Sequence, residues 1–315
     1  MIEYQLTGWV KTAFSYTGTV LPRVIYRLWV LPALTCLLLL MKHGHLGLDP
    51  QLFESIWLPP LGHSLIGTAL GLVLVFRNNA SYDRYWEGRK QWGGIVNASR
   101  NLARAARSYT GESRSLAPLI CAFCVALKHQ LRGEDPRDSI ATFVSEEDAD
   151  RFTKHPNPSL AVNLAMSEWI ASESKSKRFS QEQAQRMEEQ VSKLMDCQGA
   201  CERILKTPVP FAHAIHVRQL LFAYLLTLPF VIIPQHGWAS LITITVISLG
   251  LLGIEEAGIE IEDPFGHDHN DLPLSQICDV IARDVLALDD FDQRVQRPTV
   301  ELSDANEYIE EEEDA

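Results

Sequence analysis

Four stretches of the chain are almost wholly apolar and long enough to cross a bilayer. A membrane-spanning helix needs roughly 20 apolar residues, and a window of this length selects residues 24–41, 57–76, 216–234 and 237–254. The first contains only Arg27 near its start, and the second contains no charged residue. Because a buried helix of a soluble protein has the same pattern, the residues that flank the stretches decide between the two interpretations.

Basic residues flank these stretches on one side of the predicted membrane. They are Lys11, Arg23, Arg27, Arg77, Arg84, Arg89, Lys90, Arg203, Lys206 and Arg218. The positive-inside rule places such residues in the cytoplasm. It predicts a multi-pass protein of the inner (plasma) membrane with four transmembrane helices, two short outer loops and both termini in the cytoplasm. No leading apolar segment with a small-residue cleavage site precedes the spans, so we expect no removed signal peptide.

The polar region between the second and third spans has the periodicity of helices. Apolar positions recur at helical spacing over residues 95–107, 116–132, 160–174 and 181–205, whereas the alternation typical of strands is scarce. We therefore predict an all-α fold, in which a helical cytosolic region continues the membrane part. The predicted organisation is one unit over residues 1–300, with cytosolic helices at about 78–207 and 255–300, followed by an acidic tail at 301–315.

Average composition hides this segregation. The 315 residues are 46% hydrophobic, carry a formal net charge of −12 and have a mean hydropathy of −0.03, values typical of a soluble protein. Residues 301–315 contain eight acidic residues and no basic one, which is typical of a solvated or disordered tail; the alternative is a tail that lies on a neighbouring subunit. The negative charge disfavours a nucleic-acid partner, which requires a basic surface.

Cysteine and enzyme motifs are weak. Cys121 and Cys124 form a CxxC, and Cys197 and Cys201 a CxxxC, which permits a zinc or redox site. The surrounding LICAFCVAL has no turn residues, however, and favours packing in a buried helix. The chain contains no GxGxxG, Walker A, GxSxG or HExxH motif. We therefore expect no enzyme activity and no required cofactor.

An acidic segment follows the fourth span. It contains Glu255, Glu256, Glu260, Glu262 and Asp263, then Pro-Phe-Gly, then His267, Asp268, His269, Asn270 and Asp271. Clustered carboxylates repel one another unless a cation, a basic partner or protonation relieves them. Three interpretations stay open: a structural network; a cation-facing lining of Glu260, Glu262, Asp263, Asp268 and Asp271; or a divalent cation site that His267 and His269 join.

The second span combines small residues with an apolar stripe. Gly67 and Gly71 have the spacing of a close helix contact. Gly62, Ile66 and Leu70 recur at i, i+4 and i+8 and so share one face. If several copies met around an axis, this stripe would form stacked apolar rings of the kind that gate by dewetting. A neighbouring stripe (Leu61, Leu65 and Ala69) is the competing assignment.

Three long motifs resemble the bestrophin family in its bacterial branch. They are FRNNASYDRYWEGRKQWGGIVNASRNLAR (76–104), CERILKTPVPFAHAIHVRQLLFAY (201–224) and GLLGIEEAGIEIEDPFGHDHNDLPL (250–274), within a likeness over about residues 25–290. The resemblance implies a homopentameric ion channel with one central pore and an apolar neck from the second span. On this chain the neck falls on Gly62, Ile66 and Leu70, with Gly62 where a larger apolar residue is expected. It also implies a constriction at the cytosolic exit, which we assign to Phe179.

The resemblance leaves the permeant ion open. Animal members of the family are calcium-activated anion channels, but the acidic segment here lacks their longer uninterrupted run, so calcium gating is not expected. Bacterial members include cation channels, and an acidic vestibule would raise the local cation concentration. We therefore expect monovalent cations such as sodium to permeate, with an anion (chloride) channel of the same fold as the alternative. A membrane transporter and a membrane-tethered metalloenzyme that uses His267, Asp268 and His269 are the rival classes. The expected partners are the lipid bilayer, the permeant ions and four further copies of the chain.

Overall fold

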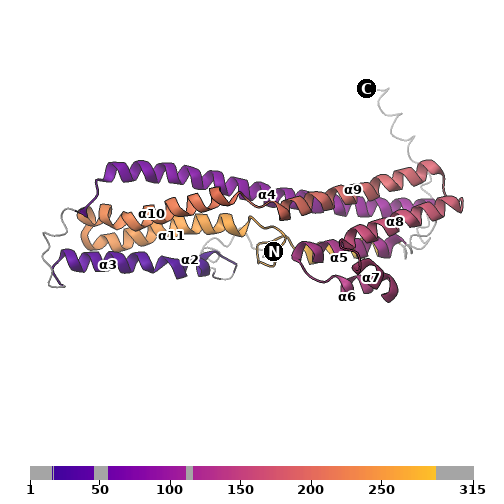
Figure 1. Cartoon of the computed structure of the whole chain (residues 1–315), viewed down its shortest axis with the longest axis horizontal. Helices are drawn as coiled ribbons and strands as arrows, with labels where there is room; N and C mark the ends of the chain where they lie inside the picture. Colours follow the sequence, from indigo (N-terminus) through magenta and orange to yellow (C-terminus); the bar gives the residue numbers. More distant parts are fainter. Residues whose placement is uncertain (1–15, 17, 46–55, 111–115, 289–315) are drawn as a thin grey trace, which may run out of the picture.

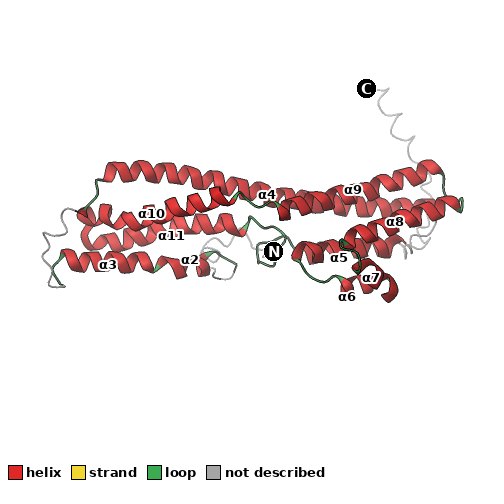
Figure 2. Ribbon diagram, in the orientation of Figure 1, coloured by secondary structure: helices red, strands yellow, loops and turns green. Residues whose placement is uncertain are grey.

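The chain is helical throughout its described part. The structure, a computed structural model, describes all residues except 1–15, 17, 46–55, 111–115 and 289–315. The described residues contain helices and turns and no strand (Figure 2), which confirms the all-α prediction for them. The helices are α2 (Leu21–Leu28), α3 (Val30–Lys42), α4 (Pro60–Thr110), α5 (Leu116–Arg132), α6 (Arg137–Ala141), α7 (Glu146–Thr153), α8 (Pro158–Lys175), α9 (Gln181–Lys206), α10 (Phe211–His236), α11 (Ser240–Glu260) and α12 (Leu274–Leu286). The predicted acidic tail at 301–315 lies outside the described residues.

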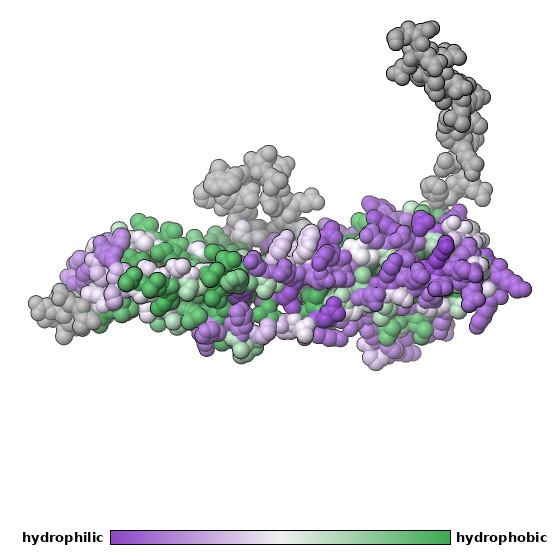
Figure 3. Space-filling view, turned by 90° about the horizontal axis from the view of Figure 1, so that it is seen from above, coloured by the Kyte–Doolittle hydropathy of each residue, from purple (hydrophilic) through white to green (hydrophobic). Residues whose placement is uncertain are grey.

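The molecule is elongated and divided into an apolar half and a polar half (Figure 1). The apolar half contains α2, α3, α10, α11 and the first part of α4. The polar half contains α5 to α9, the second part of α4, and α12, which packs against α4 and α5. In Figure 3 the hydrophobic surface gathers over one half and the hydrophilic surface over the other, as the segregation of the sequence predicts.

Three continuous helical segments are long and apolar enough to cross a membrane. They are Leu21–Lys42, Pro60–Thr110 and Phe211–Glu260. The last segment folds back at a 3-10 turn, Gly237–Ala239, so that α10 and α11 pack side by side. Gly237 has a φ of +52°, a conformation that a side chain would strain. The fold-back places the predicted third and fourth spans on separate helices, and the number of membrane crossings itself stays a prediction.

Helix α4 runs through both halves without a break. It contains 51 residues and is therefore about 76 Å long at 1.5 Å per residue. The sequence analysis instead ended a span at residue 76 and began a separate helix at residue 95. Residues 77–94 contain no proline, and two of their glycines are packing positions. A Cβ atom on Gly88 would lie 3.1 Å from Phe265, and one on Gly94 would lie 2.8 Å from Sγ of Cys197.

The core of the polar half lies where α4, α5, α8, α9 and α12 meet. Its largest fully buried side chains include Trp92 of α4 and Phe123 of α5. Helix α5 has the predicted bounds, and α8 and α9 begin and end within two residues of the predicted ones. The short helices α6 and α7 were not predicted, because too few residues occupy each one to show a period.

The cysteines of the polar half are packing residues. Cys124 and Cys201 are buried within the core. Burial raises the pKa of the Cys124 thiol well above its usual value and that of Cys201 to about 12. Thiols with such pKa values stay protonated at neutral pH and so make poor nucleophiles and poor metal ligands. The structure thus supports the packing interpretation of both cysteine motifs.

Candidate functional site

The first part of α4 exposes one apolar face. Leu61, Leu65, Leu72 and Phe76 are 74%, 65%, 57% and 61% exposed. At 100° per residue these four positions lie on one side of the helix, opposite the buried side that contains His63, Leu70, Leu74 and Arg77. A row of large apolar side chains that their own subunit leaves uncovered is available to lipid, to another copy or to a pore.

The predicted neck stripe does not lie wholly on this face. Gly62 and Ile66 are exposed, but Leu70 is only 3% exposed and packs within its own subunit against Val217 and Leu221 of α10. This burial contradicts the assignment of Leu70 to a pore lining. The competing stripe of Leu61, Leu65 and Ala69 is exposed at all three positions. The error was one of register, because apolar residues occupy several faces of this span and hydropathy alone does not orient them.

Of the two glycines predicted to form a close helix contact on α4, Gly67 is confirmed as a packing position. A Cβ atom on Gly67 would lie 2.6 Å from the hydroxyl oxygen of Tyr224, so glycine here permits the close approach of α10. One turn earlier, Nε2 of His63 lies 3.2 Å from the backbone oxygen of Tyr224 and 3.1 Å from Oγ1 of Thr227. Gly71, in contrast, has open space beside it. Gly67 and His63 therefore orient the buried side of α4 toward α10.

An arginine–carboxylate belt lies where the apolar half meets the polar half. We use this name for Arg23, Arg27, Arg77, Arg218, Glu255 and Glu256. Glu255 is 2% exposed, and its Oε1 accepts hydrogen bonds from Nη1 of Arg77 at 2.9 Å and from Nε of Arg218 at 3.0 Å. Oε2 of Glu256 accepts from Nη1 of Arg27 at 3.0 Å. Both buried glutamates are thus compensated by arginines from three other helices, as buried carboxylates require.

The belt extends into the loop that follows α11. Nη2 of Arg23 lies 2.9 Å from Oδ1 of Asp268, and Nη2 of Arg77 lies 3.9 Å from Oε2 of Glu262. Arg84 donates to the backbone oxygens of Glu262, Ile204 and Thr207 and so joins this loop to the end of α9. These contacts tie α2, α4, α9 and α11 together at the junction of the two halves.

The other predicted acidic residues also bond within the chain. Oε1 of Glu260 accepts from Nδ2 of Asn270 at 3.0 Å, and Oδ1 of Asp263 accepts from the backbone N of Phe265 at 3.2 Å. Asp271 is 4% exposed, and its Oδ2 accepts from the backbone N of Asp268 at 2.7 Å. Burial raises the pKa of Asp271 to about 6. Among the three interpretations of this segment, these contacts favour the structural network.

The two predicted histidine ligands do not converge on a metal-binding cluster. Nε2 of His267 lies 2.8 Å from Oε1 of Glu134, whose other carboxylate oxygen lies 2.6 Å from Nδ1 of His129. His269 is exposed on the loop. In the part of the chain that the structure describes, no three His, Cys, Asp or Glu side chains are arranged to hold a metal ion. The residues of one chain therefore do not fit the divalent cation site considered from the sequence.

Phe179 lies in the turn between α8 and α9, at the far end of the polar half (Figure 1). It is 6% exposed and its ring centroid is 6.5 Å from that of Trp169. A side chain buried in its own subunit cannot line a constriction, so the assignment of Phe179 is wrong in this conformation. The exposed residues of the same turn are Ser176, Lys177, Arg178 and Ser180, so the turn presents polar and basic rather than apolar side chains.

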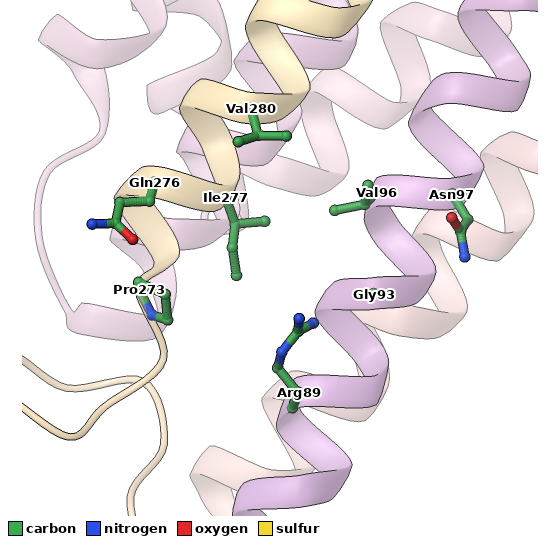
Figure 4. A pocket seen from close by; sticks show the side chains of 8 residues that line it. All are labelled: Arg89, Gly93, Val96, Asn97, Pro273, Gln276, Ile277 and Val280. Carbon is green, nitrogen blue, oxygen red and sulfur yellow. The ribbon is translucent and has the colours of Figure 1, made fainter. Parts of the chain in front are cut away.

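A cavity of about 410 Å³ lies between α4 and α12 in the polar half. Figure 4 shows Arg89 and Val96 of α4 facing Ile277 and Val280 of α12 across it. It is lined by Arg89, Gly93, Val96, Asn97, Pro273, Gln276, Ile277 and Val280. The lining contains one basic residue, Arg89, and no carboxylate.

The sequence analysis used the arginines of the belt only to orient the helices and missed their role. One signal in the sequence could have revealed this role: four arginines and the acidic segment lie at the same predicted edge of the membrane. Which carboxylate each arginine meets depends on contacts between residues 37 to 245 positions apart, and no local pattern gives these.

Comparisons with known proteins agree over most of the chain. The profile of a family described as "Bacterial/Fungal Bestrophin protein" matches residues 1–287. A Nostoc sp. protein named as a voltage-dependent anion channel-forming protein is 37% identical over 88% of this chain and 90% of its own length. The Escherichia coli K12 protein YneE, named in the same way, is 30% identical over 92% of this chain and 94% of its own. The crystal structure of a bacterial bestrophin homolog from Klebsiella pneumoniae superimposes with a TM-score of 0.78 at 28% identity, covering 85% of this chain and 98% of that one.

Proposed function

The chain belongs to the bestrophin family, and we propose that five copies of it form a membrane channel that conducts anions through a pore lined by α4. Membership of this family, whose relatives are named as channels, makes the chain a membrane ion channel and not an enzyme. The finer parts of the proposal are the permeant ion, the number of copies and the residues that face the pore. Each has its own support.

The names of the relatives favour anions. Proteins 37% and 30% identical to this chain are named as voltage-dependent anion channel-forming. The sequence analysis preferred monovalent cations and kept chloride as the alternative, and the comparisons favour that alternative. The cation expectation depended on an acidic vestibule built from the segment after α11.

The observation that carries the anion proposal is the compensation of that segment. Glu255 and Glu256 are buried against arginines, and Asp268 pairs with Arg23. A carboxylate whose charge is compensated by a neighbouring guanidinium contributes little to the field in a vestibule. These three carboxylates therefore contribute less to an acidic lining than the net charge of the sequence suggests. The exposed Lys177, in the turn between α8 and α9, adds a positive potential at the far end of the polar half.

The exposed face of α4 supports the pore assignment. Leu61, Leu65 and Ala69 are uncovered within the subunit, whereas the opposite side of the helix is buried. Along the same face, beyond the apolar part, exposed polar and charged positions include Asn79, Asp83, Lys90, Asn97 and Asn101. Five such helices around an axis would form an apolar neck that opens into a polar vestibule, as a pore that gates by dewetting requires.

Reversal potentials in a planar bilayer test the permeant ion. Purified full-length protein is recorded in asymmetric KCl, and the expected reversal potential lies close to the chloride equilibrium potential. The experiment is repeated after chloride is replaced on one side by a large organic anion, which should shift the reversal potential. A reversal potential close to that of potassium, unchanged by the anion replacement, would overturn the anion proposal and restore the cation interpretation.

A further inference from the structure

A second cavity lies in the apolar half and has a different character from the first. Its volume is about 480 Å³, and α2, α3, α10 and α11 surround it. Most of the wall is apolar and includes Val30, Leu221 and Leu225. Arg27 and Arg218 also line it, and both belong to the arginine–carboxylate belt. The cavity therefore has one charged end in an otherwise apolar wall.

The charged end carries two half-exposed guanidinium groups. The side chains of Arg27 and Arg218 are 51% and 48% exposed. Glu255, the one carboxylate of the lining, is 2% exposed and also compensates the buried Arg77. Arg218 uses Nε to bind Glu255, and among the described residues no partner bonds to its two terminal nitrogens. Arg27 donates to Glu256, which lies outside the lining. The unused hydrogen-bond donors of this end therefore include the terminal nitrogens of Arg218.

The cavity lies at the depth where a lipid headgroup meets its acyl chains. Tyr26 and Trp29, beside the charged end, are 79% and 63% exposed, as is typical of aromatic residues at a membrane interface. From Arg218 to Leu225 helix α10 rises about 10 Å toward the membrane interior. The cavity therefore offers an anion-binding end on the predicted cytoplasmic side and an apolar wall that extends into the hydrocarbon.

We propose that this cavity binds one anionic phospholipid of the cytoplasmic leaflet. Its phosphate contacts Arg27 and Arg218, and one acyl chain lies along Val30, Leu221 and Leu225. Guanidinium groups bind phosphate with charge-assisted hydrogen bonds, and basic pockets between membrane helices on the cytoplasmic side suit anionic headgroups. The two half-exposed guanidinium groups favour a lipid with a net negative headgroup over a zwitterionic one.

Native mass spectrometry of the purified full-length oligomer tests the proposal. Phosphatidylglycerol and phosphatidylcholine are titrated separately, and the wild type should bind phosphatidylglycerol more tightly. Arg218→Gln should weaken phosphatidylglycerol binding about fivefold, since one basic residue near the headgroup contributes about that factor. Leu226→Trp, which fills the apolar part of the cavity and leaves the belt intact, should remove the bound lipid.

Arg23→Gln is the matched control. Arg23 is a half-exposed arginine one turn before Arg27 on α2, belongs to the same belt and does not line the cavity, so its replacement should leave lipid binding within twofold of the wild type. Equal binding of the two lipids by the wild type, or equal losses in R218Q and R23Q, would overturn the proposal. If R218Q does not assemble, L226W and the comparison of the two lipids decide. A neighbouring subunit, rather than a lipid, would fill the cavity if the wild-type oligomer carried no lipid and the L226W chain no longer assembled. That pair of results would also overturn the proposal.

Discussion

Glu255 links more of the molecule than any other side chain of the arginine–carboxylate belt. It bonds to Arg77 of α4 and Arg218 of α10, and lies 3.6 Å from Arg27 of α2. A buried carboxylate in contact with three guanidinium groups is compensated only while the helices that bear them stay in register. The belt therefore fixes the relative positions of the helices at the junction of the two halves.

Asp271 should give the chain a characteristic pH dependence. Its pKa rises from 3.8 to about 6 on folding because the side chain is buried. Between these values the folded chain binds a proton that the unfolded chain has released, so the carboxyl lowers stability as the pH rises from about 4 to about 6. Relative to Asp271→Asn, which does not titrate, the wild type should gain up to about 3 kcal/mol as the pH falls through this window.

Thermal unfolding of both proteins in detergent at several pH values measures this difference. Asp284→Asn is the control, since Arg100 lowers the pKa of Asp284 and the stability of that pair is lost only as the pH falls below 3.8. The offset between D284N and the wild type should therefore be constant from pH 4 to 6. A D271N offset that is equally constant would contradict the assigned pKa.

The site was predictable only in part at the scale of residues. The sequence identified the acidic segment and the basic residues, because both are local concentrations of charge. It did not give their pairing, since Arg23 meets Asp268 across 245 positions. The net charge of −12 therefore led to a cation expectation that the compensated carboxylates do not support. The same applies to Phe179, whose burial depends on Trp169 of another element.

Contacts between helices depend on a few glycines. A Cβ atom on Gly258 of α11 would clash with Oδ1 of Asn78 of α4. The amide nitrogen of the same Asn78 donates to the backbone oxygen of Ile254. Glycine at this position therefore allows α4 to approach α11 closely enough for that hydrogen bond. Gly253, on the same helix, has open space beside it within the subunit.

Gly258→Ala and Gly253→Ala should consequently have different effects on the stability of the folded chain. The first displaces Asn78 and should lower the melting temperature, because a helix contact opens and the hydrogen bond of Asn78 to Ile254 is lost. The second adds a methyl group where there is room and should be neutral or stabilising by up to about 1 kcal/mol, since alanine favours the helix over glycine. Melting temperatures of the two variants in the same detergent measure the difference. Equal losses would mean that the second glycine also packs, against a neighbouring copy.

The fold was predictable where helices are long and periodic. Helices α5, α8 and α9 appear close to their predicted bounds, because a buried stripe repeats through each of them. The continuity of α4 was missed because the apolar span was ended at residue 76 and the next periodic helix was begun at residue 95, which left an apparent break that contains Gly88 and Gly94. The structure shows why there is none: Gly88 and Gly94 are where Phe265 and Cys197 pack against the helix. Glycine in a helix can mark a close neighbour as well as an end.

The assembled channel should distinguish two leucines of α4 that are only five positions apart. Leu65 is 65% exposed, and Leu70 is 3% exposed. If five copies of α4 surround the pore, Leu65→Ala should widen the apolar ring and increase single-channel conductance with little loss of stability. Leu70→Ala should instead leave a cavity in the subunit and cost about 2–5 kcal/mol, with unchanged conductance for each channel that assembles.

Single-channel recording and thermal unfolding of the same two preparations test this assignment. A conductance increase in L70A but not in L65A would restore the stripe of Gly62, Ile66 and Leu70. Unchanged conductance in both variants would mean that the narrowest part of the pore lies elsewhere along α4.

The continuity of α4 also has a mechanical consequence. The helix is about 76 Å long, and Arg77 and Arg84 bond it to neighbouring elements between its two ends. Because the same helix carries the exposed leucines at one end and the core of the polar half at the other, it acts as a lever between them. A force on the polar half that tilted α4 about these contacts would therefore also move Leu61 and Leu65, at its other end, in the opposite direction.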